Sequence, residues 1–447
     1  MKKELVAAFA LGSCLAAAGG EAAVWKAGVA KVRITPSETV WLAGYGSRNH
    51  PPEGVRHDVW AKALALEDAK GNVGVILTID VCTVDKAFTD ELLGRLAKYG
   101  IDRTKFILNC SHTHTGPAVG RSLQHIHQMD AAEWAKEERY TRWLMDALDR
   151  LVGDALARRV PAVVSTGCGQ TRFAVNRRHN RPEAQVPLLK EIKGPADYSV
   201  PVVKVEDPKG GIKAILFGYA CHPTVLADYL YSGDYAGFAQ IEVEKAHPGA
   251  VAMFFQGAGA DLNPLPRRKA SLAKQYGTEL AAAVEQVLSE EMDVREPSLV
   301  TRYEEILLPM EKPLELAELR KIGSDADPNN YYARWARAMV RERESGATLP
   351  EKWPFPVQYW TIGSQKLFAL GGELMIGYAV ELKRRYGEDS FVMGYCNDVM
   401  SYIPTPEAWD EGGYEVEHVH SESGLPAGWT RDVTKLILDA VDRIATP

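Results

Sequence analysis

The sequence lacks any concentrated block of lysine or arginine. It holds 59 Asp and Glu against 52 Lys and Arg, which gives a formal net charge of -7. A protein that binds a phosphate backbone needs a cationic surface that displaces counterions. We therefore exclude a nucleic acid as the partner. Beyond the N-terminus there is also no apolar run long enough for a membrane-spanning helix, so no later segment is predicted to be transmembrane.

Cysteines are few and show no paired spacing. One of the six lies near the N-terminus, and the other five form no Cys-x-x-Cys pattern. An odd number without this spacing gives no sign of a disulfide framework or a thiolate metal site. We interpret the five as small buried hydrophobic residues; they are Cys82, Cys110, Cys168, Cys221 and Cys396.

The first residues have the pattern of an export signal. Lys2 and Lys3 precede an apolar run over residues 5–18, and small residues follow it. This order is typical of a secretory signal peptide, so we assign residues 1–22 to one and expect an exported protein, whether periplasmic, an outer-membrane lipoprotein or secreted. The segment that ends at Cys14 also resembles a bacterial lipobox. A lipidated Cys14 that associates with a membrane surface and a plain signal peptide both remain open.

No internal repeat, low-complexity tract or linker divides the rest of the chain, so we predict one domain over residues 23–447. Short apolar runs alternate with longer segments of helical spacing. This alternation predicts an α/β fold with a mixed central sheet flanked by helices. Strands are expected near 27–34, 60–66, 73–80, 105–110, 162–167, 201–205, 213–219, 251–255, 357–362 and 366–370. Helices are expected near 87–99, 132–157, 237–246, 271–289, 313–345, from 374 onward and 434–444.

Histidines follow two of these strands directly. His112 and His114 come after the strand at 105–110, and His222 comes after the strand at 213–219. Ligands of open α/β sheets bind beyond the carboxyl ends of strands, which favours a site here. If the His-x-His backbone stays extended, its rings point to opposite faces, one toward a metal and the other toward the substrate. Taken singly, each histidine is as well explained by a structural role.

Two other strand ends carry acidic or amide side chains. The glycine-rich segment 256–264 contains Asp261 and Asn263, each of which either faces a substrate or caps a turn. The segment lacks the third glycine and the acidic partner of a dinucleotide-binding loop. Glu373 follows two glycines and is either a carboxylate at a helix N-terminus or a metal ligand.

Together these motifs resemble those of the neutral/alkaline ceramidase family, in the same order and over most of the chain that follows the signal. The most specific is His-Thr-His-Thr-Gly-Pro at residues 112–117. The other matching segments are 27–35 with Gly44-Tyr45-Gly46, Thr78-Ile79-Asp80, Asn176-Arg177, His222-Pro223-Thr224, 232–237, Gly372-Glu373 and 394–397.

The resemblance implies a zinc ion. Two imidazoles and a carboxylate are common in catalytic zinc sites, whereas a phenolate is less common. Carried over by motif, the four ligands are His112, His222, Glu373 and Tyr402.

The resemblance also implies donors on the substrate side. Arg177 and Tyr414 are expected to donate to the oxyanion of an acyl-transfer reaction. An ion pair with neighbouring charged residues explains Arg177 equally well. His114 is the natural residue to exchange a proton with the attacking water or the departing amine.

Two departures from the family weaken the link to ceramide itself. The family carries a serine in the glycine-rich loop near the reacting carbonyl, and Asn263 stands at that position. Metal-activated water needs no serine, so the chemistry survives this change. The chain also ends soon after the catalytic region, and we expect it to lack the family's C-terminal β-sandwich.

The expected activity is hydrolysis of an N-acyl amide by metal-activated water. A ceramide or related N-acyl lipid is the family's substrate. A zinc-dependent deacetylase or esterase that acts on short-acyl substrates, such as N-acetylated sugars, is the alternative enzyme. A non-catalytic binding protein on the same scaffold is the alternative from another class. The retained ligand set argues against that third hypothesis.

Overall fold

A computed structural model describes residues 24–181 and 190–446. The expected signal peptide and Cys14 lie outside these residues. Within them, no helix combines the length and the apolar character needed to cross a bilayer.

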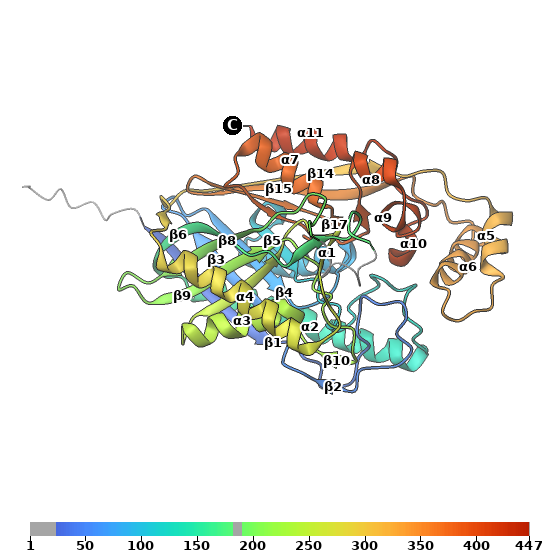
Figure 1. The fold of residues 1–447 in the computed structure, drawn as a ribbon, viewed down its shortest axis with the longest axis horizontal. Coiled ribbons are helices and arrows are strands. Elements are labelled where there is room, and N and C mark those ends of the chain that lie inside the picture. The colour runs from blue at the N-terminus through green and yellow to red at the C-terminus, as the bar shows by residue number, and fades with distance from the viewer. Residues whose placement is uncertain (1–23, 182–189, 447) are drawn as a thin grey trace, which may run out of the picture.

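The centre of the molecule is a mixed sheet of nine strands (Figure 1). Its strand order is β11-β9-β8-β6-β1-β3-β4-β5, with β13 paired to β6. The pairs β11–β9 and β4–β5 are parallel, and the others are antiparallel. The strands are β1 (Trp25–Arg33), β3 (Trp60–Glu67), β4 (Val73–Ile79), β5 (Phe106–Cys110), β6 (Val160–Gln170), β8 (Ser199–Glu206), β9 (Ile212–Tyr219), β11 (Val251–Gln256) and β13 (Asp293–Val294).

Four helices cover one face of this sheet. Helices α1 and α2 pack their apolar sides on the β1–β5 half, and α3 and α4 pack theirs on the β8–β11 half. The apolar positions of each helix recur at a spacing of three or four residues, which places them on the covered side. The helices are α1 (Lys86–Leu96), α2 (Ala131–Ala157), α3 (Asp234–Ala246) and α4 (Ala270–Ser289).

A second sheet covers the opposite face. Its strand order is β14-β15-β16-β18, and Trp360 of β15 is fully buried in the apolar layer between the two sheets. Helices α7 and α11 lie on its outer side (Figure 1). The elements are β14 (Leu299–Pro309), β15 (Lys352–Ile362), β16 (Gln365–Leu370), β18 (Phe391–Met393), α7 (Ile376–Tyr386) and α11 (Val433–Ala445).

Shorter elements join these layers. The expected helical insertion consists of two helices, α5 (Leu316–Gly323) and α6 (Tyr331–Glu344), which pack on each other at one end of the molecule (Figure 1). The remaining elements are β2 (Gly54–Val55), β7 (Ala174–Asn176), β10 (Leu230–Tyr231), β12 (Leu262–Pro264), β17 (Glu373–Leu374), β19 (Tyr402–Ile403), α8 (Pro406–Glu411), α9 (Tyr414–Glu417), α10 (His420–Ser423) and the short 3-10 turns 97–99 and 103–105.

The predicted fold class is confirmed: helices flank a large mixed sheet. Each expected strand and helix has a counterpart. The second sheet was not anticipated as a separate layer, because β14 was missed. Its residues are mostly half-exposed or exposed and mix charged with apolar side chains, so the apolar run typical of a buried strand is absent. The interpretation of all five cysteines as buried was wrong for Cys168, which is exposed on β6, whereas the other four are buried.

Helix α2 approaches β1 so closely that only glycine fits at Gly28. A Cβ atom there would lie 2.1 Å from the Ala155 carbonyl oxygen. We predict that Gly28→Ala lowers the free energy of unfolding by about 1–3 kcal/mol, as overpacking of a rigid interior does. Gly94 on α1 meets no atom outside its own helix, so Gly94→Ala is expected to raise stability by about 0.5–1 kcal/mol. Urea denaturation measures both changes, and equal effects would contradict the close contact.

Candidate metal centre

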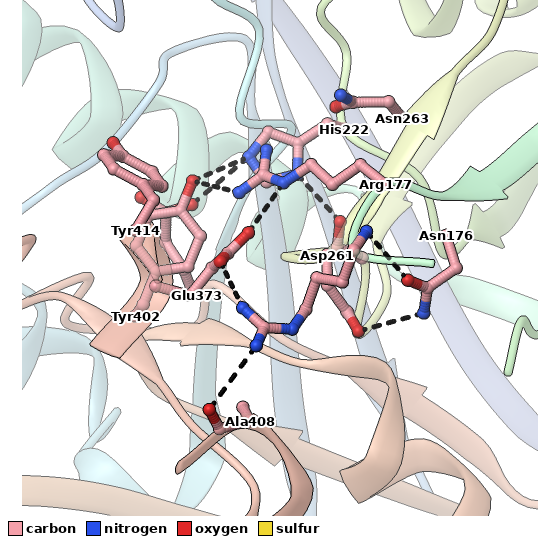
Figure 2. A network of polar contacts seen from close by, with 12 residues as sticks. Asn176, Arg177, His222, Asp261, Asn263, Glu373, Tyr402, Ala408 and Tyr414 are labelled. Atoms are coloured by element: carbon pink, nitrogen blue, oxygen red, sulfur yellow. Dashed lines mark hydrogen bonds and ion pairs between the residues drawn. The ribbon is translucent and has the colours of Figure 1, made fainter. Parts of the chain in front are cut away.

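The loops after several strands bring the four expected ligands together. His112 follows β5, and His222 follows β9. Glu373 opens β17, which pairs in parallel with β19 so that Glu373 stands opposite Tyr402. All four side chains are buried. Figure 2 shows His222, Glu373 and Tyr402 pointing toward one another.

The ligand atoms have the spacing of a tetrahedral site. Nε2 of His112 lies 3.2 Å from Nε2 of His222, and these two atoms lie 3.2 and 3.3 Å from Oε2 of Glu373. The Tyr402 hydroxyl oxygen is 3.3 Å from Nε2 of His222. Zinc bonds of 2.0–2.1 Å at tetrahedral angles separate neighbouring ligand atoms by about 3.3 Å. The side chains of His112, His222 and Glu373 are therefore spaced as one small cation requires, and Tyr402 adjoins them at His222.

The outer nitrogens of both imidazoles are fixed by the backbone. Nδ1 of His112 lies 2.9 Å from the Cys82 carbonyl oxygen, and Nδ1 of His222 lies 2.7 Å from the Gly259 carbonyl oxygen. A carbonyl oxygen only accepts, so each Nδ1 carries a proton and donates it. This leaves the lone pair of each neutral Nε2 directed at the centre, as in other histidine metal sites.

The centre attracts positive charge. Burial raises the pKa of Glu373, but the neighbouring His112 charge and hydrogen bonds from His112 and His222 hold it well below its ordinary value. Burial lowers the pKa of His222 to about 4. Burial also lowers the pKa of His112, yet the Cys82 sulfur and the Glu373 carboxylate raise it well above its ordinary value. A cation is thus required among these acceptors, either a proton on His112 or a metal ion that contacts all of them.

His114 joins the same cluster, and the expectation of opposite faces for the His-x-His rings was wrong. His112 has a φ of 59°, so the backbone is left-handed there instead of extended. Nε2 of His114 consequently lies 3.1 Å from Nε2 of His112. Nδ1 of His114 has no hydrogen-bond partner among the described residues. The ring packs on Tyr45 and on Gly44, where a Cβ atom would lie 2.5 Å from it.

Arg177 reaches the centre from β7. Its Nη2 donates to the Tyr402 hydroxyl at 3.2 Å, and its Nε donates to Glu415 at 2.9 Å. Arg178 binds the other oxygen of Glu415. The side chain forms an ion pair, although not with the neighbouring residues that were expected, and its role as a donor to the substrate stays a prediction. Its partner is Glu415, 238 residues away in the sequence.

Tyr414 also lies beside the centre, but its hydroxyl is already engaged. Its ring centroid is 5.5 Å from that of Tyr402. Its hydroxyl donates to Glu422 at 2.7 Å. The single phenolic proton therefore points at a carboxylate, which changes how this tyrosine can contribute.

Asn263 is fully buried near His222, one of the expected ligands. It lies on β12, opposite Val175 of β7, and its Oδ1 accepts a 3.4 Å hydrogen bond from Thr224. The preceding residue, Leu262, accepts the backbone N–H of His222. Figure 2 shows Asn263 beside His222. A role toward the substrate remains a prediction.

Residues 25–267 match the sequence model of the neutral/alkaline non-lysosomal ceramidase family, N-terminal part. This range is more than half of the 447 residues. The chain belongs to the neutral/alkaline ceramidase family.

Two curated relatives carry the name neutral ceramidase. The protein from Pseudomonas aeruginosa is 26% identical over 250 residues, which are 54% of this chain and 37% of the relative. The protein from Mycobacterium tuberculosis is 23% identical over 457 residues, covering 84% of this chain and 70% of the relative. The first match thus spans little more than a third of its relative's length.

The fold is shared with a solved ceramidase. The crystal structure of the Pseudomonas aeruginosa neutral ceramidase superposes with a TM-score of 0.73 at 20% identity, over 95% of this chain and 74% of the other. A ceramidase complexed with C2 gives a TM-score of 0.71 at 20% identity, over 94% of this chain and 74% of the other. Identities this low establish the fold alone.

Three acidic residues near the centre of this ceramidase-family protein lacked an assigned function. Asp261 accepts the backbone N–H of Ile376 at 2.8 Å, so it fixes the start of α7 just after Glu373 rather than a turn of its own segment. Glu415 directly follows Tyr414, and this position in the sequence was the one feature that could have identified it as part of the site. No feature of the sequence identified Glu422, because its hydrogen-bond partners lie in other segments.

Glu415 binds two arginines in a buried position and has no exposed surface. We predict that Glu415→Ala lowers the free energy of unfolding by about 3–5 kcal/mol, because it leaves buried charge unpaired. Glu411, which binds Arg178 with 38% of its side chain exposed, supplies the control: Glu411→Ala should cost at most about 1 kcal/mol.

The ion pairs of Glu415 with Arg177 and Arg178 also predict that stability depends on pH. Burial raises the pKa of Glu415, but Arg177 and Arg178 hold it below its ordinary value. Its stabilisation is therefore present at neutral pH and is lost as the pH falls through the lowered pKa. Urea denaturation of the wild type and Glu415→Ala at pH 7 and at acidic pH should show the difference between them shrinking in acid. A constant difference would contradict an ionised Glu415.

Proposed function

We propose that this protein is a zinc-dependent hydrolase of an N-acyl amide bond. The observation that carries the proposal is the convergence of two neutral Nε2 lone pairs and one carboxylate oxygen, all within 3.3 Å of one another. Their donor types and spacing suit zinc. Tyr402 is the fourth ligand in this proposal. Burial and the Glu373 carboxylate hold its pKa well above the ordinary value, and the hydrogen bond from Arg177 opposes that rise.

A divalent ion held by these residues supplies a water of lowered pKa and a Lewis acid for the carbonyl. The chain's own residues do the rest. Arg177 places positive charge next to the centre, where negative charge develops on the acyl oxygen. His114 takes up a proton at the Nε2 that faces the cluster and returns it to the departing amine.

We propose an N-acyl lipid as the substrate, following the names of the curated relatives. The N-terminal sequence pattern supports an exported enzyme. Small N-acetylated amines, including amino sugars, are the second candidate, because Asn263 stands where the family has serine. A binding protein without catalysis is disfavoured, since it gives no reason for the fixed tautomers of His112 and His222.

Metal content tests the centre independently of activity. We expect about one zinc per chain by elemental analysis, removable by chelation and restored by added zinc. His222→Ala should weaken zinc binding at least about 100-fold, more than a change in an outer hydrogen-bond partner does. His247→Ala is the control. His247 follows α3 and binds Glu285 of α4, so its loss should leave zinc binding unchanged. A His222→Ala protein that still binds zinc like wild type would sink the ligand assignment.

Amine release from a panel of amides tests the reaction. The panel runs from long-chain ceramide through short-chain N-acyl lipids to N-acetylated sugars, each with and without chelator. We expect chelator-sensitive cleavage, led by the N-acyl lipids. Asn263→Ser should change the preference within the panel and leave zinc content unaltered. A zinc-loaded protein that cleaves none of these amides would favour the binding protein.

A further inference from the structure

Glu422 links three segments around the metal centre. It lies on α10 and accepts hydrogen bonds from the hydroxyls of Tyr414, the first residue of α9, and of Tyr331, the first residue of α6. Tyr331 belongs to the helical insertion formed by α5 and α6. The insertion thus reaches the centre through this carboxylate.

The three side chains lie beside the centre. Tyr414 packs its ring against Tyr402, and 42% of its surface is exposed. Tyr331 packs near Gly46, in the same loop as Tyr45, whose ring contacts His114. Glu422 lies close enough to the centre for the charges of Glu373 and Arg177 to act on it, so groups next to a substrate carbonyl at the centre would come near this carboxylate.

The carboxylate is only half satisfied by its partners. An ionised carboxylate has about four acceptor positions, and the two phenols occupy two of them. Both partners are neutral, and Arg177, the cation that acts on Glu422, is paired with Glu415. Burial raises the pKa of Glu422 to about 7, which hydrogen-bond donors from a ligand would lower again. The free acceptor positions are available to a substrate.

We infer that Glu422, held by Tyr331 and Tyr414, selects the amine part of the substrate. It accepts hydrogen bonds from hydroxyl groups next to the scissile amide, and it repels an amine part that carries a carboxylate. The preferred substrates are therefore N-acyl amino alcohols and N-acyl amino sugars, and N-acyl amino acids are rejected. This inference rests on the proposed amide hydrolysis and adds a residue that sets its specificity.

A matched pair of substrates isolates the charge. N-octanoylserinol and N-octanoylserine have the same acyl chain and nearly the same size. The serinol amide carries a hydroxymethyl group where the serine amide carries a carboxylate. We expect the wild-type kcat/KM to favour the serinol amide at least about tenfold, since like charges at close range are costly. Glu422→Gln keeps the side-chain shape and an acceptor for the phenols. It should shrink the ratio to about threefold or less, mainly through a gain on the serine amide.

Two further variants serve as a control and as a second test of the substrate preference. Glu407→Gln removes an exposed carboxylate on neighbouring α8 and should leave the ratio unchanged. Tyr331→Phe removes one donor to Glu422 and should lower the ratio partway, which provides a test if Glu422→Gln fails to fold. Zinc content should stay at the wild-type level in all three variants.

The outcomes separate the two proposals. If zinc-loaded wild type cleaves neither amide, the proposed hydrolysis fails and the inference falls with it. If both amides are cleaved and the ratio is near one, or is the same in wild type, Glu422→Gln and Tyr331→Phe, the selective role of Glu422 alone is overturned. A ratio that falls in Glu422→Gln and not in Glu407→Gln supports it.

Discussion

The whole site depends on keeping three acceptor atoms at a distance where they repel one another unless a cation lies between them. Nε2 of His112, Nε2 of His222 and Oε2 of Glu373 are 3.2–3.3 Å apart in a buried position, where charges are poorly screened. Their orientation is set from outside by the Cys82 and Gly259 carbonyl groups. Neither imidazole can rotate away without losing a buried hydrogen bond, so the backbone preserves an arrangement that is favourable only when a positive charge is present.

The surrounding fold provides this rigidity through long-range pairing. Tyr402 is placed opposite Glu373 by the β17–β19 bridge, and Asp261 anchors the helix that starts three residues after Glu373. The first contact joins two loops that follow strands of the second sheet, and the second contact joins a loop of the large sheet to the start of α7. The apolar layer around Trp360 holds these two sheets together, so loosening that layer would also move the carboxylate relative to the imidazoles.

The sequence predicted the strands because apolar runs end abruptly in polar side chains. The grouping of His112, His222, Glu373 and Tyr402 came from the family resemblance, because each of these residues taken alone also fits a structural role. It could not predict the left-handed turn at His112, because nothing in a His-x-His pattern distinguishes extended from turned backbone. It also missed β14, whose charged outer surface resembles a loop. The pairing of Arg177 with Glu415 and of Tyr331 with Glu422 could not be predicted, since ion pairs and hydrogen bonds between distant segments leave no local pattern.

These pairings assign different roles to the two expected oxyanion donors. A phenol has one proton, and that of Tyr414 is directed at Glu422, so it cannot also be offered to a carbonyl oxygen in this arrangement. A guanidinium has five N–H groups, and the contacts of Arg177 with Tyr402 and Glu415 leave others available. Glu415 also prevents Arg177 from swinging out to solvent. In the proposed reaction, stabilisation of the oxyanion is therefore assigned to Arg177, and Tyr414 is assigned to the amine side of the substrate together with Glu422.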